Sequence, residues 1–140
     1  MIQKKLLRLL ALLLFAALPQ QRAFSQCFQI ESILVDACGA QEGLNEMVRF
    51  KTGNTPLNAN TLNVDWPNNN WGGIIQNGTT AAKTAALNAD IVAAGGCGQL
   101  VEPPAGIIPA NATAILVTSY NIDTALNPFG AITETIYIIY

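Results

Sequence analysis

The sequence has 140 residues, nine carboxylates, seven cations and no histidine. This length suits one domain of ordinary size. The lack of histidine excludes Ser-His-Asp and Cys-His catalysis and removes the commonest transition-metal ligand.

The first 25 residues have the pattern of a secretory signal peptide. A basic start precedes an apolar run from Leu9 to Leu18, and a polar stretch with small residues follows. The run is too short to cross a bilayer, which needs about 20 apolar residues. We therefore expect export through the Sec pathway, cleavage after Ser25, and no membrane span in the mature chain. A lipoprotein signal acylated on Cys27 is the alternative.

Loss of this segment would leave a strongly acidic chain. All nine carboxylates follow Ser25, and only three cations remain beside them, Arg49, Lys51 and Lys83, so the net charge becomes −6. Binding to phosphate backbones and to anionic membrane surfaces depends on Lys and Arg. We therefore expect neither nucleic acid nor a membrane surface as a partner.

Two strands are predicted at the start of the mature chain. Residues 28–36 predict the first, although their alternation is imperfect because Ile30 and Ile33 fall on opposite faces. A glycine-containing loop follows, and residues 45–51 predict the second strand.

Further strands are predicted from five short segments. Residues 61–66 and 71–76 flank the turn PNNN within a stretch rich in turn-forming residues. Residues 97–102 form a short extended piece, and residues 113–119 and 133–140 are rich in β-branched and aromatic side chains, which is typical of strands. The pattern predicts a mostly-β sandwich of roughly seven strands.

One helix is predicted between these strands. The alanine-rich residues 81–94 favour it, Thr79 or Thr80 is expected to cap its start, and Gly95 and Gly96 are expected to end it. Its buried stripe is expected to consist of Leu87, Ile91 and Ala94.

The three cysteines are Cys27, Cys38 and Cys97. In an exported protein they favour disulfides, and an odd number leaves one without a partner in the chain. We expect Cys38 to pair with Cys97, which closes a loop of about 58 residues and contributes about 4 kcal/mol in the chain-entropy model. Cys27 is then unpaired or paired outside the chain. A Cys27–Cys97 bond is the alternative.

Carboxylates are the remaining candidates for chemistry. Two of them can cleave a glycosidic bond, and the candidates are Asp36, Glu42, Glu46 and Asp65. Acids at loop and strand ends are usually only solvated, so we expect no enzyme. The first three, with Asn45 nearby, are also the candidate ligands of a structural calcium ion, although no EF-hand spacing is present.

Two short motifs are candidate sugar sites. The segment WPNNNWGG offers Trp66 and Trp71 faces with the Asn69 amide, which suit a pyranose ring; the alternative is that the tryptophans pack on the core. The tripeptide DTA at 123–125 resembles the Asp-Thr/Ser-aliphatic O-glycosylation motif of Bacteroidetes secreted proteins, with Thr124 as the modified residue.

Several blocks together resemble known modules. They are ESILVDACG, EGLNEMVRFKTGN, a Trp-containing strand, a helix, and IIPANATAILVTS. This order resembles the N-terminal modules of large Bacteroidetes secreted proteins, which often end in a gliding-motility-associated, type IX secretion sorting domain. It is also similar to lamin-tail domains, which implies an immunoglobulin-like sandwich without catalytic residues. The helix at 79–94 and the lack of a sorting domain depart from these patterns.

These features predict a non-catalytic binding or structural module of a secreted or cell-surface, adhesin-like protein. The module is expected to cover residues 27–140, as an immunoglobulin-like, lamin-tail-like β-sandwich with a helix inserted around 80–94. The apolar residues 133–140 lead us to expect a longer chain, whose other domains, or a surface glycan or protein, are the partners. The alternative is a carbohydrate-binding or accessory module of a secreted hydrolase. No cofactor is expected.

Overall fold

The computed structural model describes residues 28–35, 42–66 and 69–140 of the chain. Within them, a five-stranded sheet consists, in this order, of β1 (Phe28–Leu34), β2 (Met47–Thr52), β8 (Thr113–Val117), β9 (Thr135–Ile139) and β6 (Gln99–Val101). Two smaller sheets pair β3 (Leu57–Asn58) with β7 (Ile107–Ile108) and β4 (Asp65–Trp66) with β5 (Asn69–Asn70). The helices are α2 (Gly78–Ala93) and three short 3-10 turns, η1 (Glu42–Leu44), η2 (Ala59–Thr61) and η3 (Pro104–Gly106).

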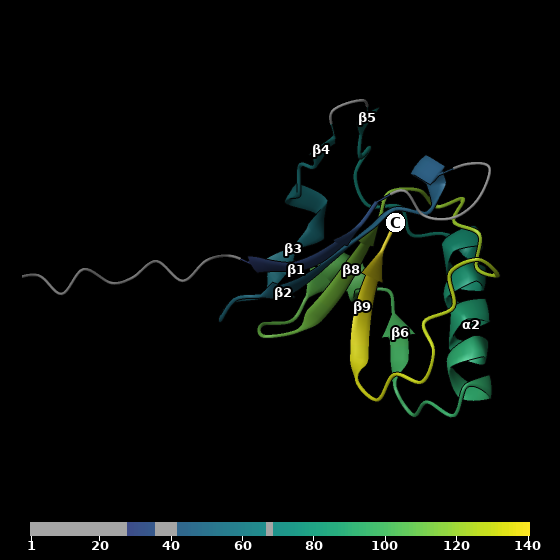
Figure 1. The fold of residues 1–140 in the computed structure, drawn as a ribbon. Helices are drawn as coiled ribbons and strands as arrows, with labels where there is room; N and C mark the ends of the chain where they lie inside the picture. Colours follow the sequence, from purple (N-terminus) through teal and green to yellow (C-terminus); the bar gives the residue numbers. More distant parts are fainter. Residues whose placement is uncertain (1–27, 36–41, 67–68) are drawn as a thin grey trace, which may run out of the picture.

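The five-stranded sheet is mixed. β2 pairs antiparallel with β1 and β8, whereas β9 pairs parallel with both β8 and β6. Strand β8 lies in the middle, and all five of its residues are buried. Its unbroken apolar run, AILV, is typical of a strand that is covered on both faces (Figure 1).

Helix α2 confirms the helix predicted from the alanine-rich segment. Its cap is Asn77 rather than a threonine, because the Asn77 side chain accepts hydrogen bonds from Thr79 N at 2.8 Å and Thr80 N at 3.2 Å. The Thr80 hydroxyl accepts one in return from Asn77 N, which completes a capping box. No helix among the described residues has the length and apolar character that a membrane crossing requires.

The buried face of α2 differs in part from the prediction. Leu87 and Ile91 are buried as expected, and Thr80 and Thr84 continue their stripe. Ala94 is exposed, because it forms the C-cap at the end of the helix, beyond the sheet contact.

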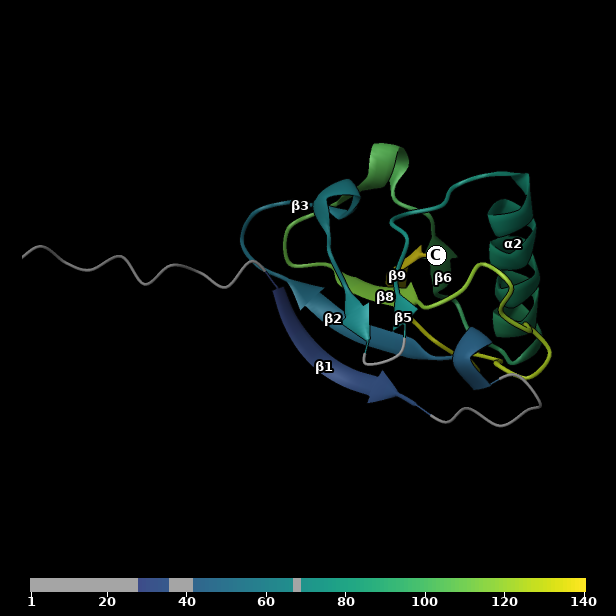
Figure 2. The same cartoon turned by 90° about the horizontal axis from the view of Figure 1, so that it is seen from above.

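The core has two parts, one on each face of the sheet. On one face, α2 packs against residues that alternate along the central strands, including Ile115, Ile136 and Ile138. On the other face, the intervening side chains, such as Leu116 and Ile139, pack against β7 and the loops around η2. Seen from above, β1 and α2 lie at opposite ends of the domain (Figure 2).

Most predicted strands are present, with tighter bounds. The five-stranded sheet includes the strands predicted at 28–36, 45–51, 97–102, 113–119 and 133–140. The strand predicted at 71–76 is wrong: this segment is irregular, and its apolar residues are used to cover the sheet rather than to extend it. The domain is mixed α/β rather than mostly β, and the inserted helix is confirmed.

A buried tyrosine directly after β9 contacts α2 and predicts a loss of stability in alkali. The Tyr140 hydroxyl and Thr84 Oγ1 lie 2.9 Å apart. Burial raises the pKa of Tyr140 to about 12, opposed by the Thr84 hydrogen bond and assisted by the charge of Glu102. In the unfolded chain the tyrosine pKa is about 10, so the unfolded state loses its proton first as the pH rises. The free energy of unfolding should therefore fall between about pH 10 and pH 12, by about 1.4 kcal/mol per pH unit.

Urea unfolding of the wild type and of Tyr140→Phe at pH 8 and at pH 11 checks this. At pH 8 the variant should be less stable by about 1 kcal/mol, because it lacks the hydroxyl that bonds to Thr84. At pH 11 the difference should be near zero, since only the wild type loses stability through this group. The same pH dependence in both proteins would contradict the assignment.

Candidate functional site

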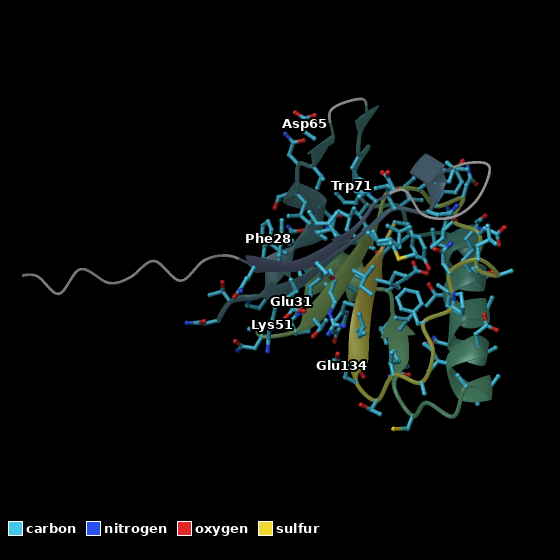
Figure 3. All side chains as sticks on the ribbon, in the orientation of Figure 1. Phe28, Glu31, Lys51, Asp65, Trp71 and Glu134 are labelled. Atoms are coloured by element: carbon cyan, nitrogen blue, oxygen red, sulfur yellow. The ribbon has the colours of Figure 1, made fainter. Side chains whose placement is uncertain are left out.

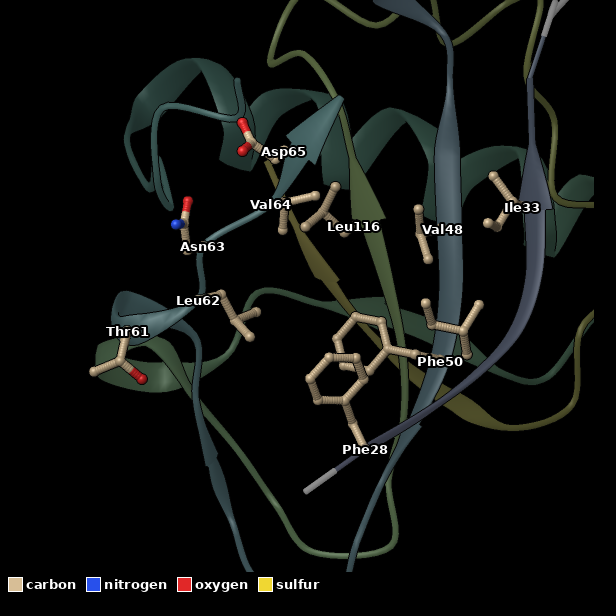
Figure 4. A pocket seen from close by; sticks show the side chains of 11 residues that line it. Phe28, Ile33, Val48, Phe50, Thr61, Leu62, Asn63, Val64, Asp65 and Leu116 are labelled. Atoms are coloured by element: carbon tan, nitrogen blue, oxygen red, sulfur yellow. The ribbon is translucent and has the colours of Figure 1, made fainter. Parts of the chain in front are cut away.

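An apolar groove opens on the face of the sheet opposite α2. It has a volume of about 450 Å³ and lies between β1, β2, β8 and the segment 61–65. Figure 4 shows side chains from these elements converging on it. Its lining consists of Phe28, Ile30, Ile33, Val48, Phe50, Thr61, Leu62, Asn63, Val64, Asp65 and Leu116.

The floor of the groove belongs to the hydrophobic core. Val48 and Phe50 on β2 and Leu116 on β8 are buried and point to this face, because they alternate with residues that face the other side. The Phe50 ring meets the Phe28 ring edge to face, with 5.5 Å between the centroids. The floor is therefore formed by side chains whose positions are fixed by their packing in the hydrophobic core.

A β-bulge shapes the wall that β1 contributes. The pairing with β2 shifts between Ile30 and Ser32, so that Ile30 lies opposite Phe50 and Ile33 opposite Val48. The extra residue, Glu31, changes the alternation, and Ile33 comes to the same face as Ile30. The imperfect alternation in the sequence was the signal of this bulge.

The apolar side chains of β1 are not covered. Phe28, Ile30 and Ile33 are 38, 53 and 51 % exposed, although they lie in a strand of the main sheet. Exposed single apolar residues are ordinary on protein surfaces, but a contiguous set beside a cavity marks an interaction site. These residues were not among the sites predicted from the sequence, because apolar strand residues were expected to be buried.

The opposite wall, segment 61–65, is held by hydrogen bonds. Thr61 Oγ1 donates to Asn58 O at 2.8 Å, and Trp71 N donates to Val64 O at 3.1 Å. Leu62 and Val64 pack against the core from this wall. Asp65 is the one ionisable side chain among the lining residues, so the groove offers mainly apolar contact.

The other face of β1 carries an ion-pair network, beside one exposed apolar residue, Leu34. Arg49 Nε donates to Glu31 Oε2 at 2.9 Å, and its Nη2 donates to Glu134 Oε1 at 3.0 Å. In Figure 3, Glu31 and Glu134 lie on the side of the sheet opposite Phe28 and Asp65. These ion pairs are exposed and each contributes little to stability, but they fix the face that β1 turns away from the groove.

The predicted sugar-binding residues are only partly described. Trp71 is 7 % exposed and packs in the core, so its ring is not an open platform. Trp66 and Asn69 lie in β4 and β5, but their side chains lie outside the described part of the structure. The burial of Trp71 therefore supports the alternative, in which this tryptophan packs on the core.

The predicted calcium ligands are not brought together among the described residues. Asp36 and the Glu42 side chain lie outside them, and no group of three potential ligands occurs within them. Near Glu46, the amide oxygen of Asn45 accepts hydrogen bonds from Asp123 N and Asn127 Nδ2, both at 3.0 Å. Through these two hydrogen bonds, that oxygen holds the loop that contains Asp123 and Asn127.

The remaining predicted sites are the cysteines and the glycosylation motif. Cys97 is free and exposed, and its expected partner Cys38 lies outside the described residues, as does Cys27. Thr124 is half-buried in a turn between β8 and β9, where Asp123 Oδ1 accepts a hydrogen bond from Ala125 N at 3.0 Å.

Comparison with known proteins gives no relative. No family model, no curated protein and no solved structure matches the chain. A function for this chain therefore has to be inferred from the groove and its surroundings.

Proposed function

We propose that this chain is a non-catalytic binding module that holds an apolar ligand in the groove beside β1. The single observation that carries this proposal is the set of exposed apolar side chains, Phe28, Ile30 and Ile33, at the mouth of a cavity of about 450 Å³. This volume lies in the range of small-molecule and peptide sites, and such sites are mostly apolar with few polar groups.

The proposal places the module in a secreted or cell-surface, adhesin-like protein, with gliding motility and type IX secretion as its setting. The supports are the leader-like residues 1–25 and the resemblance of the sequence blocks to Bacteroidetes modules. We also propose that the fold is a reduced, lamin-tail-like sandwich. Its second layer would be the β3–β7 pair, which packs on the sheet through Ile108 and Leu57.

A carbohydrate-binding module of a secreted hydrolase is the second candidate. Thr61, Asn63 and Asp65 line one wall of the groove and supply hydroxyl, amide and carboxylate groups, while Phe28 offers an aromatic face. A sugar ring needs this combination of polar and aromatic contacts. The apolar lining outnumbers these groups, so an apolar ligand is the first choice.

Titration with Nile red, a neutral apolar dye, tests the proposed function. The chain should bind the dye saturably, and Ile30→Thr should weaken binding about fivefold, because it replaces apolar contact in the groove by a hydroxyl. Since Ile30 is half exposed, the variant should keep its fold, which circular dichroism would verify.

The matched control is Val92→Thr. Val92 is 68 % exposed on α2, remote from the groove lining, so the same kind of exchange there should leave dye binding unchanged. Equal loss in both variants, or no saturable binding in the wild type, would refute the groove as a binding site. If a panel of soluble glycans competes with the dye and apolar peptides do not, the second candidate replaces the first.

A further inference from the structure

The two outer edges of the five-stranded sheet differ. At one edge, Asn88 on α2 accepts a hydrogen bond from Leu100 N at 2.7 Å and donates one to Leu100 O at 2.9 Å. The amide of Asn88 thereby takes the place of a neighbouring strand beside β6. At the other edge lies β1, and the described residues bring no further strand to its outer side (Figure 2).

Strand β1 has one of the features by which edge strands avoid pairing, the bulge at Glu31, but lacks others. It is seven residues long and contains neither proline nor lysine, and every residue in it is exposed. Its one charged residue, Glu31, is engaged by Arg49 on the face away from the groove. The bulge at Glu31 brings Ile33 to the groove face beside Ile30. A long, exposed, apolar edge is a template for another strand.

A strand added to this edge would extend the groove. Neighbouring strands lie about 4.8 Å apart, and alternate side chains of a strand share one face. Every second side chain of the added strand would therefore lie beside Phe28, Ile30 or Ile33. Backbone hydrogen bonds would supply affinity, and the groove would select apolar side chains at alternate positions.

Charge argues against a second copy of this chain as that strand. The described residues carry eight carboxylates and three cations, and Asp65 lies at the groove itself. Antiparallel pairing of two β1 strands about their centre would set the two Glu31 side chains against each other, and like charges in opposed positions destabilise a strand pair. Around β1, the carboxylates of Glu31, Asp65 and Glu134 outnumber the cations of Arg49 and Lys51, and the described residues as a whole are acidic, which favours a basic partner.

We infer that an extended, basic segment of a different protein adds as a strand to the outer edge of β1, with its alternate apolar side chains against the groove. This inference rests on the proposed function and adds the class of ligand and the way in which it is held. The segment has apolar residues at every second position and lysine or arginine at its ends.

A synthetic peptide tests this inference: nine residues, valine alternating with threonine, a lysine at each end, and blocked termini. It should bind the full chain in a calorimetric titration and slow amide hydrogen exchange along β1. A peptide with alternate backbone amides methylated should bind at least about tenfold more weakly, because it cannot complete the strand pairing. A peptide with glutamate ends should bind about fivefold more weakly, and this gap should close at about 0.5 M salt.

Variants and sedimentation complete the test. Ile33→Thr should weaken peptide binding severalfold, whereas Val92→Thr should not. Equal binding of the methylated peptide would overturn strand addition, and a concentration-dependent dimer of the chain alone that displaces the peptide would make a second copy the occupant. Binding of Nile red without any binding of the lysine peptide would overturn this inference while leaving the proposed function intact.

Discussion

Replacing Gly98 with alanine should lower the free energy of unfolding by about 3 kcal/mol, as forced overpacking does. A Cβ atom at this position would meet backbone rather than a movable side chain: it would lie 2.7 Å from Glu134 N, 2.9 Å from Thr133 C, and closer still to Glu134 O. Gly98 N also donates to Ile132 O at 2.8 Å, and Gln99 N to Glu134 O at 3.1 Å. The close approach of these two segments starts the parallel pairing of β6 with β9.

The matched control is Gly78→Ala in the first turn of α2. A Cβ atom there meets no atom within 4 Å, and alanine favours the helix more than glycine does. Its stability should be unchanged or higher by up to about 1 kcal/mol. Urea unfolding of both variants measures the difference, and a Gly98→Ala protein as stable as the control would show that residues 132–134 do not need to lie against this glycine.

Local pattern was sufficient for the helix and for the longest strands. The alanine-rich segment could hardly form anything but α2, and TAILV has the β-branched, apolar composition of a covered strand. The strand predicted at 71–76 failed because Trp71 and Ile74 are apolar for a different reason: they cover the sheet as part of an irregular segment.

The parallel strand pairs could not be predicted from the sequence. Parallel neighbours are joined by long connections, so no hairpin turn marks them. Strand β9 lies between β8 and β6, and its Ile136 packs in one core cluster with Leu87 and Ile91 of α2. The mixed sheet therefore depends on packing between segments that are far apart along the chain.

The groove could be predicted only in part. Its floor, Val48 and Phe50, was recognisable as strand residues, but its opposite wall at 61–65 is brought to β1 by tertiary contacts, among them the pairing of β3 with β7 just before it. The bulge at Glu31 was indicated in the sequence by the broken alternation between Ile30 and Ile33. Nothing in the sequence indicated that the side chains of β1 are exposed, because the composition of β1 is that of a buried strand.

Truncation of the two phenylalanines that are in contact at the groove should lower the free energy of unfolding by very different amounts. Phe50 is 3 % exposed and forms the floor, so Phe50→Ala should lower the free energy of unfolding by about 3–5 kcal/mol, the usual effect of removing a buried aromatic ring. Phe28 is 38 % exposed at the end of an edge strand, so Phe28→Ala should cost about 1 kcal/mol or less. Urea denaturation of each variant measures both values.

The effect of Phe28→Ala should be larger on ligand binding than on stability. Phe28→Ala should remain folded yet bind Nile red about five- to tenfold more weakly, because the ring that is lost contributes to the groove more than to the core. Since the two rings meet with 5.5 Å between their centroids, the double variant should be less destabilised than the sum of the single ones, by about 0.5–1 kcal/mol. If Phe28→Ala instead destabilises the domain as much as Phe50→Ala does, then β1 is held as core, and its exposed side chains serve folding rather than recognition.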